Sequence, residues 1–227
     1  MNYKEGAILV FDKPYGWTSF QLVNKVRWLL CKKFDWKKLK VGHAGTLDPL
    51  ATGLMIICTG GATKRIDEIQ VMPKQYIAEI TFGASTPSFD LETEVDKTYE
   101  TKHLTPELIK ETLAKFIGEI EQVPPLFSAK MVEGVRAYQL ARNGIKMDLN
   151  PSRVKIYDLE LLNFASPVAT ISVSCSKGTY VRSLARDLGL ALNSGGHLTA
   201  LRRTAVGHYK ESDAQKIETF QKNLISV

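Results

Sequence analysis

The stretch LKVGHAGTLDPLATGLMIICTGGATK, residues 39–64, decides the fold, because a glycine-rich loop runs directly into the apolar segment LMIIC. Such an apolar run is typical of a strand that is buried on both faces, and the loop before it carries one carboxylate, Asp48. Pro49 restricts Asp48 to extended backbone conformations, so the loop presents this side chain stiffly. Composition alone favours a structural role, in which Asp48 caps the turn by bonding nearby amides.

The segments around this loop show strand and helix patterns without the regular alternation of a doubly wound parallel sheet. Residues 76–82 alternate at the period of a strand, with Tyr76, Ala78, Ile80 and Phe82 on one side. The other predicted strands are residues 7–11, 54–58, 153–161 and 168–176, with a further strand within 195–209. These patterns predict an α+β fold with a mixed, mainly antiparallel sheet flanked by helices, in a single domain that spans residues 1–227.

Helices are predicted where capping residues precede apolar periodicity. The first follows Thr18 or Ser19 and carries Phe20, Val23, Val26 and Leu30 on its apolar side. A second has Thr105 as its cap, Pro106 at its first position and Gly118 at its end. The remaining predicted helices cover residues 63–72, a short stretch ending at Gly144, residues 180–192, and the C-terminal segment from Ser212.

Positive charge is concentrated in one segment of the chain. The net charge is +6, and residues 20–40 hold seven cations against Asp35 alone. The seven are Lys25, Arg27, Lys32, Lys33, Lys37, Lys38 and Lys40. Trp28, Phe34 and Trp36 interleave with them, which suits a phosphate-rich polymer with bases that can stack. A solvated helix face followed by a lysine-rich loop is the structural alternative.

Several functional classes have no support in the sequence. Cys31, Cys58 and Cys175 lie far apart, so neither a disulfide framework nor a cysteine-rich zinc site is expected. The GxxxxGK, GxGxxG and GxSxG patterns are missing, which argues against nucleotide hydrolysis, dinucleotide binding and a serine nucleophile elbow. No apolar run reaches the roughly 20 residues of a membrane span, and the N-terminus shows no signal-peptide pattern, so we expect a cytoplasmic protein.

Motifs along the chain resemble those of one enzyme family. The loop GHAGTLDPLATGLM resembles the signature loop of the TruB family of tRNA pseudouridine synthases, GHxGTLDPxAxGxL. Other family elements are matched in the same order by DKPYGWTS, GATK, KQY, QVPPLFSAKMVEGVRAYQLARNG, SCSKGTYVRSLARDLG and GGHLTALRRTAVG. The matches run from Lys13 to Gly207, so they cover about the whole catalytic region.

The resemblance implies an isomerase that converts uridine to pseudouridine, in the family's bacterial branch at position 55 in the T loop of tRNA. The target base lies inside a folded loop, so the reaction requires base flipping. The family needs no metal or other cofactor, and we expect a guide-independent monomer whose partner is the tRNA T stem-loop, with no required protein partner. A guide-dependent RNA synthase and a pure RNA-binding module are the alternatives.

The resemblance also assigns the site residues. It makes Asp48 the catalytic aspartate, Arg182 the cation that keeps it ionised, and Tyr76 the residue that stacks on the base and is implicated in removing the C5 proton. Whether Asp48 attacks the sugar, attacks the base or removes a sugar proton stays open. The expected substrate-binding residues are His43, Tyr180, Leu201, Lys64 and Lys13, the last in structural support or in phosphate contact.

The chain departs from the family pattern in two places. Pro87 stands where the family often has an acidic residue, so the turn before Asp90 carries no site assignment. Bacterial members commonly continue into a C-terminal RNA-binding domain of the PUA type, which this sequence does not show. We therefore expect recognition to rest on the T loop, with residues 20–40 as a candidate contact for the RNA backbone.

Overall fold

The computed structural model describes residues 2–127, 131–132, 135–136 and 149–225. The chain forms two compact units: unit 1 is Met1–Tyr76 with Leu201–Val227, and unit 2 is Ile77–Ala200. The chain passes from one unit to the other within two strands, β4 (Lys74–Phe82) and β12 (Gly196–Val206). The α+β class predicted from the sequence is confirmed, and the single catalytic domain stays a prediction.

The strands of unit 1 are arranged around the apolar run of the signature stretch. They are β1 (Gly6–Lys13), β2 (Val41–His43), β3 (Ala51–Gly60), the end of β12, and β13 (Tyr209–Lys210). Strand β3 pairs antiparallel with β1 and β2 and parallel with β12. Residues 53–59 are all buried, so the strand predicted at 54–58 is confirmed and is longer than expected.

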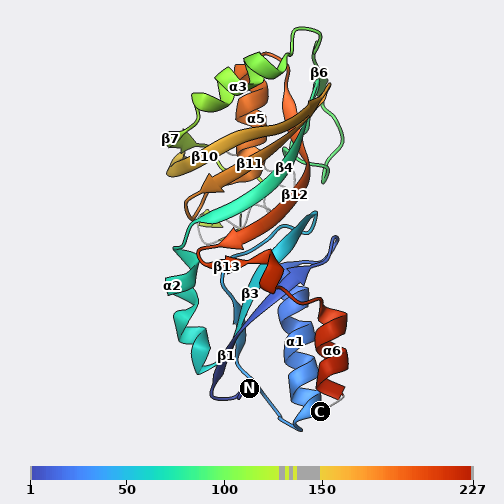
Figure 1. Cartoon of the computed structure of the whole chain (residues 1–227), viewed down its shortest axis with the longest axis vertical. Coiled ribbons are helices and arrows are strands. Elements are labelled where there is room, and N and C mark those ends of the chain that lie inside the picture. The colour runs from blue at the N-terminus through green and yellow to red at the C-terminus, as the bar shows by residue number, and fades with distance from the viewer. Residues whose placement is uncertain (1, 128–130, 133–134, 137–148, 226–227) are drawn as a thin grey trace. The chain divides into compact units, whose positions relative to one another are not determined.

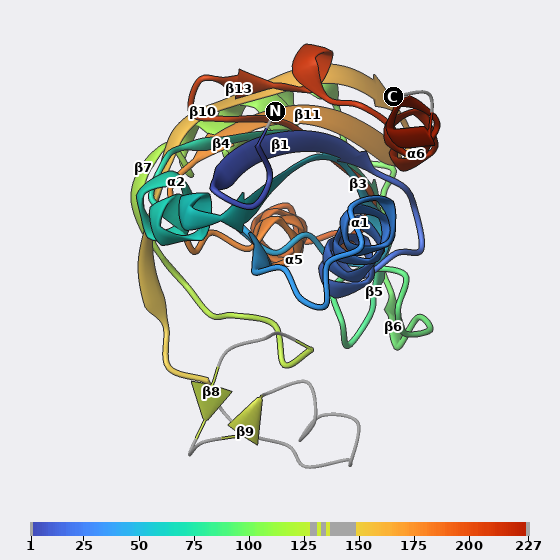
Figure 2. The same cartoon turned by 90° about the horizontal axis from the view of Figure 1, so that it is seen from below.

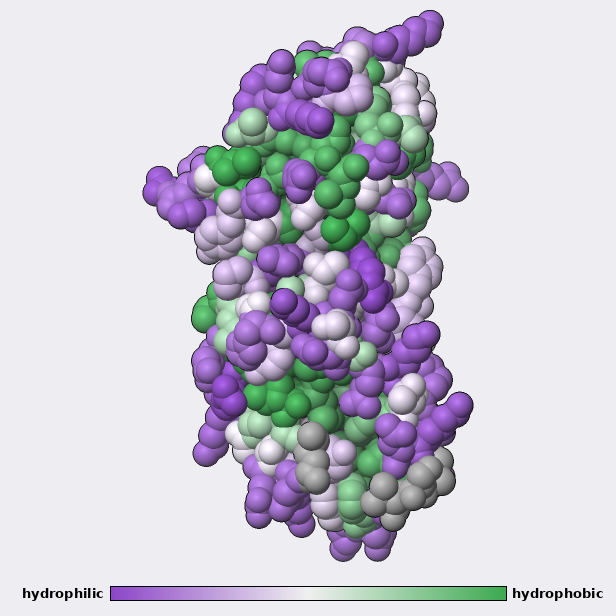
Figure 3. Space-filling model, viewed as in Figure 1, coloured by the Kyte–Doolittle hydropathy of each residue, from purple (hydrophilic) through white to green (hydrophobic). Residues whose placement is uncertain are grey.

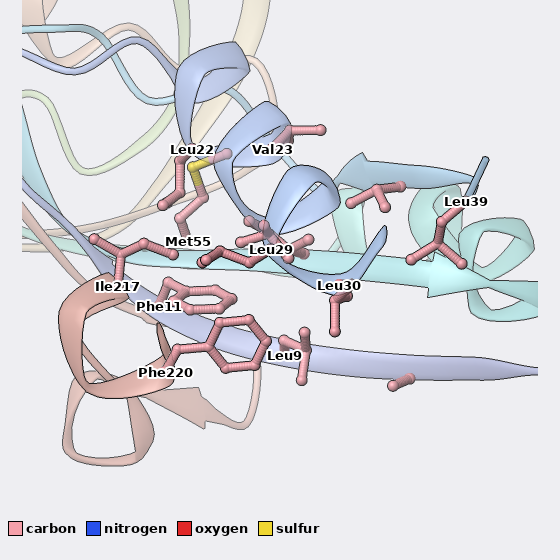
Figure 4. Packing of buried hydrophobic residues seen from close by; sticks show 14 of the residues in the cluster. Leu9, Phe11, Leu22, Val23, Leu29, Leu30, Leu39, Met55, Ile217 and Phe220 are labelled. Atoms are coloured by element: carbon pink, nitrogen blue, oxygen red, sulfur yellow. The ribbon is translucent and has the colours of Figure 1, made fainter. Parts of the chain in front are cut away.

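An apolar cluster fixes two helices on the strands of unit 1. Helix α1 (Ser19–Lys33) and helix α6 (Ile217–Ile225) lie side by side in Figure 1. Figure 4 shows Leu22 of α1 and Phe220 of α6 pointing into the cluster that Phe11 of β1 occupies, and the rings of Phe11 and Phe220 are 5.2 Å apart, edge to face. Thr18 caps α1, since its Oγ accepts the Gln21 N–H at 3.1 Å.

The strands of unit 2 follow the order β12, β4, β11, β10, β7. Strand β10 (Ser152–Ala165) pairs antiparallel with both β11 (Val168–Cys175) and β7 (Gly118–Gln122). Burial along β4 alternates as predicted, with Ala78, Ile80 and Phe82 buried. One-sided burial of this kind is typical of an antiparallel sheet with one face on the core and the other in water.

Helices α3 (Pro106–Ala114) and α5 (Val181–Ala191) pack on one face of this sheet. Figures 1 and 2 show α5 on one face of strands β4 and β11, and α3 packs against β10 and α5. On the other face, β10 exposes Tyr157 and Leu162, and apolar patches lie over these strands in Figure 3. The helices therefore bury one face of the sheet, as the alternation along β4 requires.

Some sequence predictions are wrong in detail. Phe20 is 64% exposed, and Leu22 takes the place expected for it on the apolar side of α1. Helix α3 ends at Ala114, and Gly118, whose φ of 109° favours glycine, begins the strand β7 in place of a helix end. The C-terminal helix begins at Ile217, because residues 211–213 form a separate 3-10 turn, η2 (Glu211–Asp213).

Short helical turns and hairpins connect the larger elements. Residues 61–70 form η1 (Gly61–Arg65) and α2 (Ile66–Gln70), which confirms the helix predicted there. Two small hairpins pair β5 (Ala84–Ser85) with β6 (Lys97–Thr98), and β8 (Met131–Val132) with β9 (Val135–Arg136), the second of which is seen in Figure 2. The helix predicted to end at Gly144 lies outside the described residues.

Two kinds of feature are missing from the described residues. No helix among them is long and apolar enough to cross a membrane. In the same part of the chain, no three histidine, cysteine, aspartate or glutamate side chains are grouped so that they could hold a metal ion.

Candidate active site

Asp48 lies in the loop between β2 and β3, where the sequence places it. Its side chain is half-buried, and its own carbonyl accepts the Ala51 N–H at 3.1 Å, which closes a tight turn over Pro49 and Leu50. The Pro49 carbonyl accepts the Gly16 N–H at 2.8 Å from the loop after β1. Two main-chain hydrogen bonds therefore hold this turn.

Lys13, at the end of β1, supports this loop by hydrogen bonds to main-chain carbonyl groups. The side chain is completely buried, and its ammonium donates to the carbonyl oxygens of Pro14 at 3.0 Å, Trp17 at 2.7 Å and Pro49 at 3.4 Å. Of the two roles expected for Lys13, its burial and its three carbonyl partners favour structural support over contact with an RNA phosphate.

The charge of Lys13 acts on Asp48 as well. Burial lowers the pKa of Lys13 to about 8, and the negative charge of Asp48 acts in the opposite direction and raises it. The attraction is mutual, so the ammonium stabilises the ionised form of the Asp48 carboxylate. Unit 1 thus contains its own buried cation for the catalytic aspartate that the sequence predicts.

A pH profile tests this contribution. The unfolded chain binds the Lys13 proton more tightly than the folded protein does, so this group makes the free energy of unfolding rise, not fall, between pH 8 and 10.5. We nevertheless expect the single-turnover rate to fall about tenfold from pH 7 to 9, as the ammonium beside Asp48 loses its proton. Lys13→Arg, whose charge does not titrate, should lose this fall. An identical profile for both proteins would contradict the assignment.

Several effects act on the pKa of His43, at the end of β2. Burial lowers this pKa most, the nearby positive charge of Arg203 lowers it further, and a hydrogen bond with the Gly45 main chain acts in the opposite direction. The net lowering favours the neutral imidazole. The main chain of His43 pairs in register with Ile57 of β3, the strand that follows the Asp48 loop. A neutral imidazole interacts with RNA through hydrogen bonds and stacking and not as a cation.

The other predicted residues of unit 1 occupy three different elements. Leu201, on β12, lies opposite Ala51 in the parallel pairing with β3, directly at the end of the Asp48 loop. Tyr76 is buried on β4, with 8% of its surface exposed, and Lys64 is exposed on η1. Lys13, His43 and Leu201 are therefore tied through strand pairing or direct bonds to the stretch that carries Asp48, whereas Tyr76 and Lys64 are placed by elements that follow it.

In unit 2, Arg182 is part of a buried ion pair. Its Nη1 lies 3.5 Å from Oδ2 of Asp90, and only 4% and 7% of the two side chains are exposed. The guanidinium also donates to the carbonyl oxygens of Ser88 at 3.4 Å and Phe127 at 3.0 Å. The charge of Arg182 is therefore buried and held by three partners within unit 2.

Asp90, the ion-pair partner of Arg182, has no role assigned from the sequence. It follows Phe89, whose φ of 63° is unusual for a bulky residue and turns the loop back on itself. The hydroxyl groups of Thr86 and Ser88 donate to the Asp90 carbonyl at 2.7 and 3.2 Å, which fixes the turn. The acidic residue that follows STPSF was visible in the sequence, but its pairing with Arg182 depends on this turn.

Tyr180 immediately precedes α5 and is fixed by its main chain. Its N–H donates to Oε1 of the buried Gln122 at 2.7 Å, and Ser183 Oγ donates to the Val123 carbonyl at 2.7 Å. These two bonds tie the start of α5 to the end of β7. Tyr180 and Arg182 are therefore presented from one anchored turn of helix.

Comparison with protein families identifies the chain. Residues 32–181 match the model of the N-terminal domain of the TruB family of pseudouridylate synthases. Residues 182–226 match the model of the C-terminal domain of tRNA pseudouridylate synthase B. The chain belongs to the TruB family. It is a pseudouridine synthase, an isomerase, as the resemblance of its motifs predicted.

Individual relatives span nearly the whole chain of this TruB family member. A protein of Phocaeicola vulgatus named tRNA pseudouridine synthase B is 59% identical over 220 residues, which cover 97% of this chain and 94% of the relative. A protein of Flavobacterium johnsoniae with the same name is 51% identical over 224 residues and covers 98% of both chains. A crystal structure of a Cbf5-Nop10-Gar1 complex contains a chain with a TM-score of 0.73 and 27% identity, covering 98% of this chain and 55% of that one.

Proposed function

We propose that this TruB family enzyme isomerises the uridine at position 55 in the T loop of tRNA, without a guide RNA and without a cofactor. The relatives named tRNA pseudouridine synthase B support tRNA as the substrate class. The observation that carries the proposal is Asp48 on a loop whose turn is closed by main-chain bonds, where the charge of the buried Lys13 favours the ionised carboxylate. We also propose a cytoplasmic monomer with no required protein partner.

The reaction itself needs only proton transfers and one exchange of bonds. The N1–C1′ bond breaks, the uracil turns within the site, and a C5–C1′ bond forms. C5 then loses its proton and N1 gains one, so substrate and product have the same composition. Asp48 contributes as nucleophile or as base, and each of these roles requires the ionised form.

Arg182 is proposed to be the second cation that acts on Asp48. A guanidinium beside a carboxylate forms charge-assisted hydrogen bonds in a fixed planar geometry. The pairing of Arg182 with Asp90, Ser88 and Phe127 within unit 2 supports the proposal, because it holds the guanidinium in one orientation before substrate binds.

Tyr76 is proposed to stack on the flipped uracil and to assist removal of the C5 proton. We expect Tyr76→Phe to keep tRNA binding and lower the single-turnover rate at least about tenfold, because the ring stays and the hydroxyl is removed. Tyr76→Leu should lower the rate further and also weaken the binding of tRNA. Rapid-quench measurement of pseudouridine together with filter binding separates the two effects. Equal and mild losses in both variants would make Tyr76 an ordinary core residue.

The target base is proposed to leave the T loop and enter the site, because a base that undergoes chemistry at N1 and C5 cannot stay stacked. His43, Lys64, Tyr180 and Leu201 are proposed to surround it. His43 would contribute as a neutral group, since burial and the charge of Arg203 lower its pKa. Lys64, which is exposed, is available to an RNA phosphate.

The basic segment, residues 20–40, is proposed to contact the RNA backbone. Three of its cations make contacts within the protein. The ammonium groups of Lys25 and Lys32 lie 4.8 and 4.9 Å from the ring centre of Trp28. Arg27 donates to the Val41 carbonyl at 3.1 Å, which gives it a structural role. The remaining lysines of the segment are exposed, and they are Lys33, Lys37, Lys38 and Lys40.

We expect the triple change Lys33→Gln, Lys37→Gln and Lys38→Gln to weaken tRNA binding and to flatten its salt dependence, by about 0.9 unit of slope for each phosphate that is no longer neutralised. The plot of log Kd against log salt concentration measures this slope. A matched control replaces three exposed lysines of unit 2, Lys102, Lys110 and Lys115, with Gln. If the control flattens the slope as much as the test variant, the basic segment is not the specific contact.

The experiment that tests the proposed function uses the purified protein and an unmodified tRNA transcript. Pseudouridine is mapped at nucleotide resolution, and a transcript with cytidine at the target position serves as the control. We expect one modified site, in the T loop, without any added RNA or protein. Modification that needs a guide RNA would favour the guide-dependent alternative, and tight binding without modification would favour an RNA-binding module.

A further inference from the structure

We propose that Ser19 and Arg203 are positioning residues that hold the Asp48 loop in its reactive conformation. This inference rests on the proposed catalytic role of Asp48. The observation behind it is that the five consecutive carbonyl groups of residues 45–49 all accept hydrogen bonds. An irregular glycine-containing loop does not by itself fix its main chain, so the bonds that fix this one must come from elsewhere.

Ser19 anchors the residue directly before Asp48. Its hydroxyl oxygen accepts the Leu47 N–H at 2.8 Å and donates to the Leu47 carbonyl at 2.9 Å, so one side chain satisfies both main-chain groups. Ser19 is 4% exposed and Leu47 is 3% exposed, which excludes water as the usual competitor. Because Ser19 is the first residue of α1, the loop is joined to a helix rooted in the apolar cluster of unit 1.

Arg203 anchors the loop on both sides of Asp48. Its Nε donates to the Leu54 carbonyl at 2.7 Å, while Nη1 and Nη2 donate to the carbonyl groups of Thr46 at 3.4 Å and Gly45 at 3.3 Å. The side chain is 1% exposed, so these carbonyl groups are its partners in place of water. A planar guanidinium reaches three acceptors in fixed directions, which an ammonium at the same place cannot do.

Gly53 makes this arrangement possible. In the sheet, Gly53 pairs with Arg203 of β12 on one side and with Lys13 of β1 on the other. The buried side chains of Arg203 and Lys13 therefore belong to the two residues that flank Gly53. A Cβ on Gly53 would lie 2.4 Å from the Arg203 carbonyl oxygen, and the φ of 100° is itself unfavourable for other residues. The bare backbone therefore lets β12 approach closely enough for Arg203 to reach the loop.

A residue that only stabilises the fold would affect melting, whereas a positioning residue affects the rate of chemistry in protein that is fully folded. Displacement of a catalytic group by about 1 Å costs on the order of a hundredfold in rate. The carbonyl groups of residues 45–49, on both sides of Asp48, all accept hydrogen bonds. Loss of the bonds from Ser19 or from Arg203 would therefore allow such a displacement. Substrate binding should change little, because neither buried side chain reaches the RNA.

The test measures the single-turnover rate at saturating enzyme, the tRNA Kd and Tm for two pairs of variants at a temperature well below melting. Ser19→Ala is compared with Thr18→Ala, which loses the cap of α1 but no bond to the loop. Arg203→Lys is compared with Arg202→Lys, whose partners are Asp12 at 3.1 Å, Glu211 at 2.6 Å and, at 3.5 Å, the Thr52 hydroxyl on β3, none of which lies within residues 45–49. Each control is expected to lose stability of the same order as its partner variant.

We expect Ser19→Ala to lower the rate about tenfold and Arg203→Lys about a hundredfold, with Kd within about threefold of the wild type. Both controls should keep the wild-type rate within about threefold. Wild-type rates in folded Ser19→Ala and Arg203→Lys, or equal losses in the controls, would overturn the proposal. If Arg203→Lys does not fold, Ser19→Ala decides alone, since removing one hydroxyl at a helix start leaves the core intact. An active Asp48→Asn would instead refute the proposed function itself.

Discussion

Asp48→Asn is expected to abolish pseudouridine formation, with a fall of at least about a thousandfold in the single-turnover rate. The amide has nearly the same shape as the carboxylate but carries no charge, so it serves neither as nucleophile nor as base. Affinity for tRNA should stay within about threefold, because phosphate contacts away from this loop supply most of the binding free energy. Rapid-quench assays and filter binding on the same preparation measure the two quantities.

The matched control for this change is Asp67→Asn, which alters an exposed carboxylate on α2 in the same unit. It should leave both rate and affinity unchanged. Mass spectrometry has to verify that the asparagine in Asp48→Asn is intact, because deamidation would restore the aspartate. Appreciable turnover by verified Asp48→Asn would remove this residue from the mechanism.

Arg182→Lys is expected to lower the single-turnover rate by about a hundredfold or more. A single ammonium cannot keep the contacts that the guanidinium makes with Asp90, Ser88 and Phe127 and also present a planar edge to a carboxylate. Arg182→Met should in addition lower the free energy of unfolding by about 3–5 kcal/mol, because Asp90 would be left as a buried charge without this partner. Denaturant unfolding and single-turnover kinetics report the two effects separately.

Arg186→Lys provides the control, since Arg186 lies on the same helix but pairs with Asp187 at 2.6 Å near the surface. Its side chain is 21% exposed, and the change should cost less than about 1 kcal/mol of stability. The rate of this variant should stay within about threefold of the wild type. A near-normal rate in Arg182→Lys, or the same loss in Arg186→Lys, would contradict the assigned role of Arg182.

The elements with strong periodicity could be predicted from the sequence. Strand β4 alternates because one face of the sheet lies on the core, and the run LMIIC of β3 is apolar because both of its faces pack in apolar clusters. The motif resemblance proposes Asp48, His43 and Leu201 as site residues, and the structure places the last two on strands that pair with the strand following Asp48. Tyr180 and Arg182 fell on the helix start predicted for them.

The parts that sequence could not give depend on contacts between distant segments. Strand β7 reads GEIEQ, which is too polar to stand out, because it lies at the edge of its sheet and buries few side chains. Phe20 fits the apolar spacing of α1 as well as Leu22 does, and only the direction from which β1 and α6 pack decides between them. The ion pair between Asp90 and Arg182 depends on the turn at Phe89, whose positive φ no local sequence pattern predicts.

The two arginines of the segment LRRT, Arg202 and Arg203, have different surroundings that the sequence does not predict. Arg202 and Arg203 are neighbours of identical type, so no local pattern separates them. Alternation along β12 turns Arg202 towards Asp12 and Glu211 with 39% of its side chain exposed, and buries Arg203 against the Asp48 loop. The role proposed for Arg203 therefore becomes visible only in the structure.

Release of tritium from a tRNA transcript labelled at C5 of the T-loop target uridine alone measures the central claim most directly. Conversion to pseudouridine removes the C5 hydrogen, because C5 becomes bonded to C1′, so release counts each isomerisation at that base. We expect the wild-type protein, without guide RNA or partner, to release tritium in stoichiometric amount, and Asp48→Asn to release none under the same conditions. No release by the wild type, or equal release by Asp48→Asn, would contradict the proposal that Asp48 isomerises this uridine.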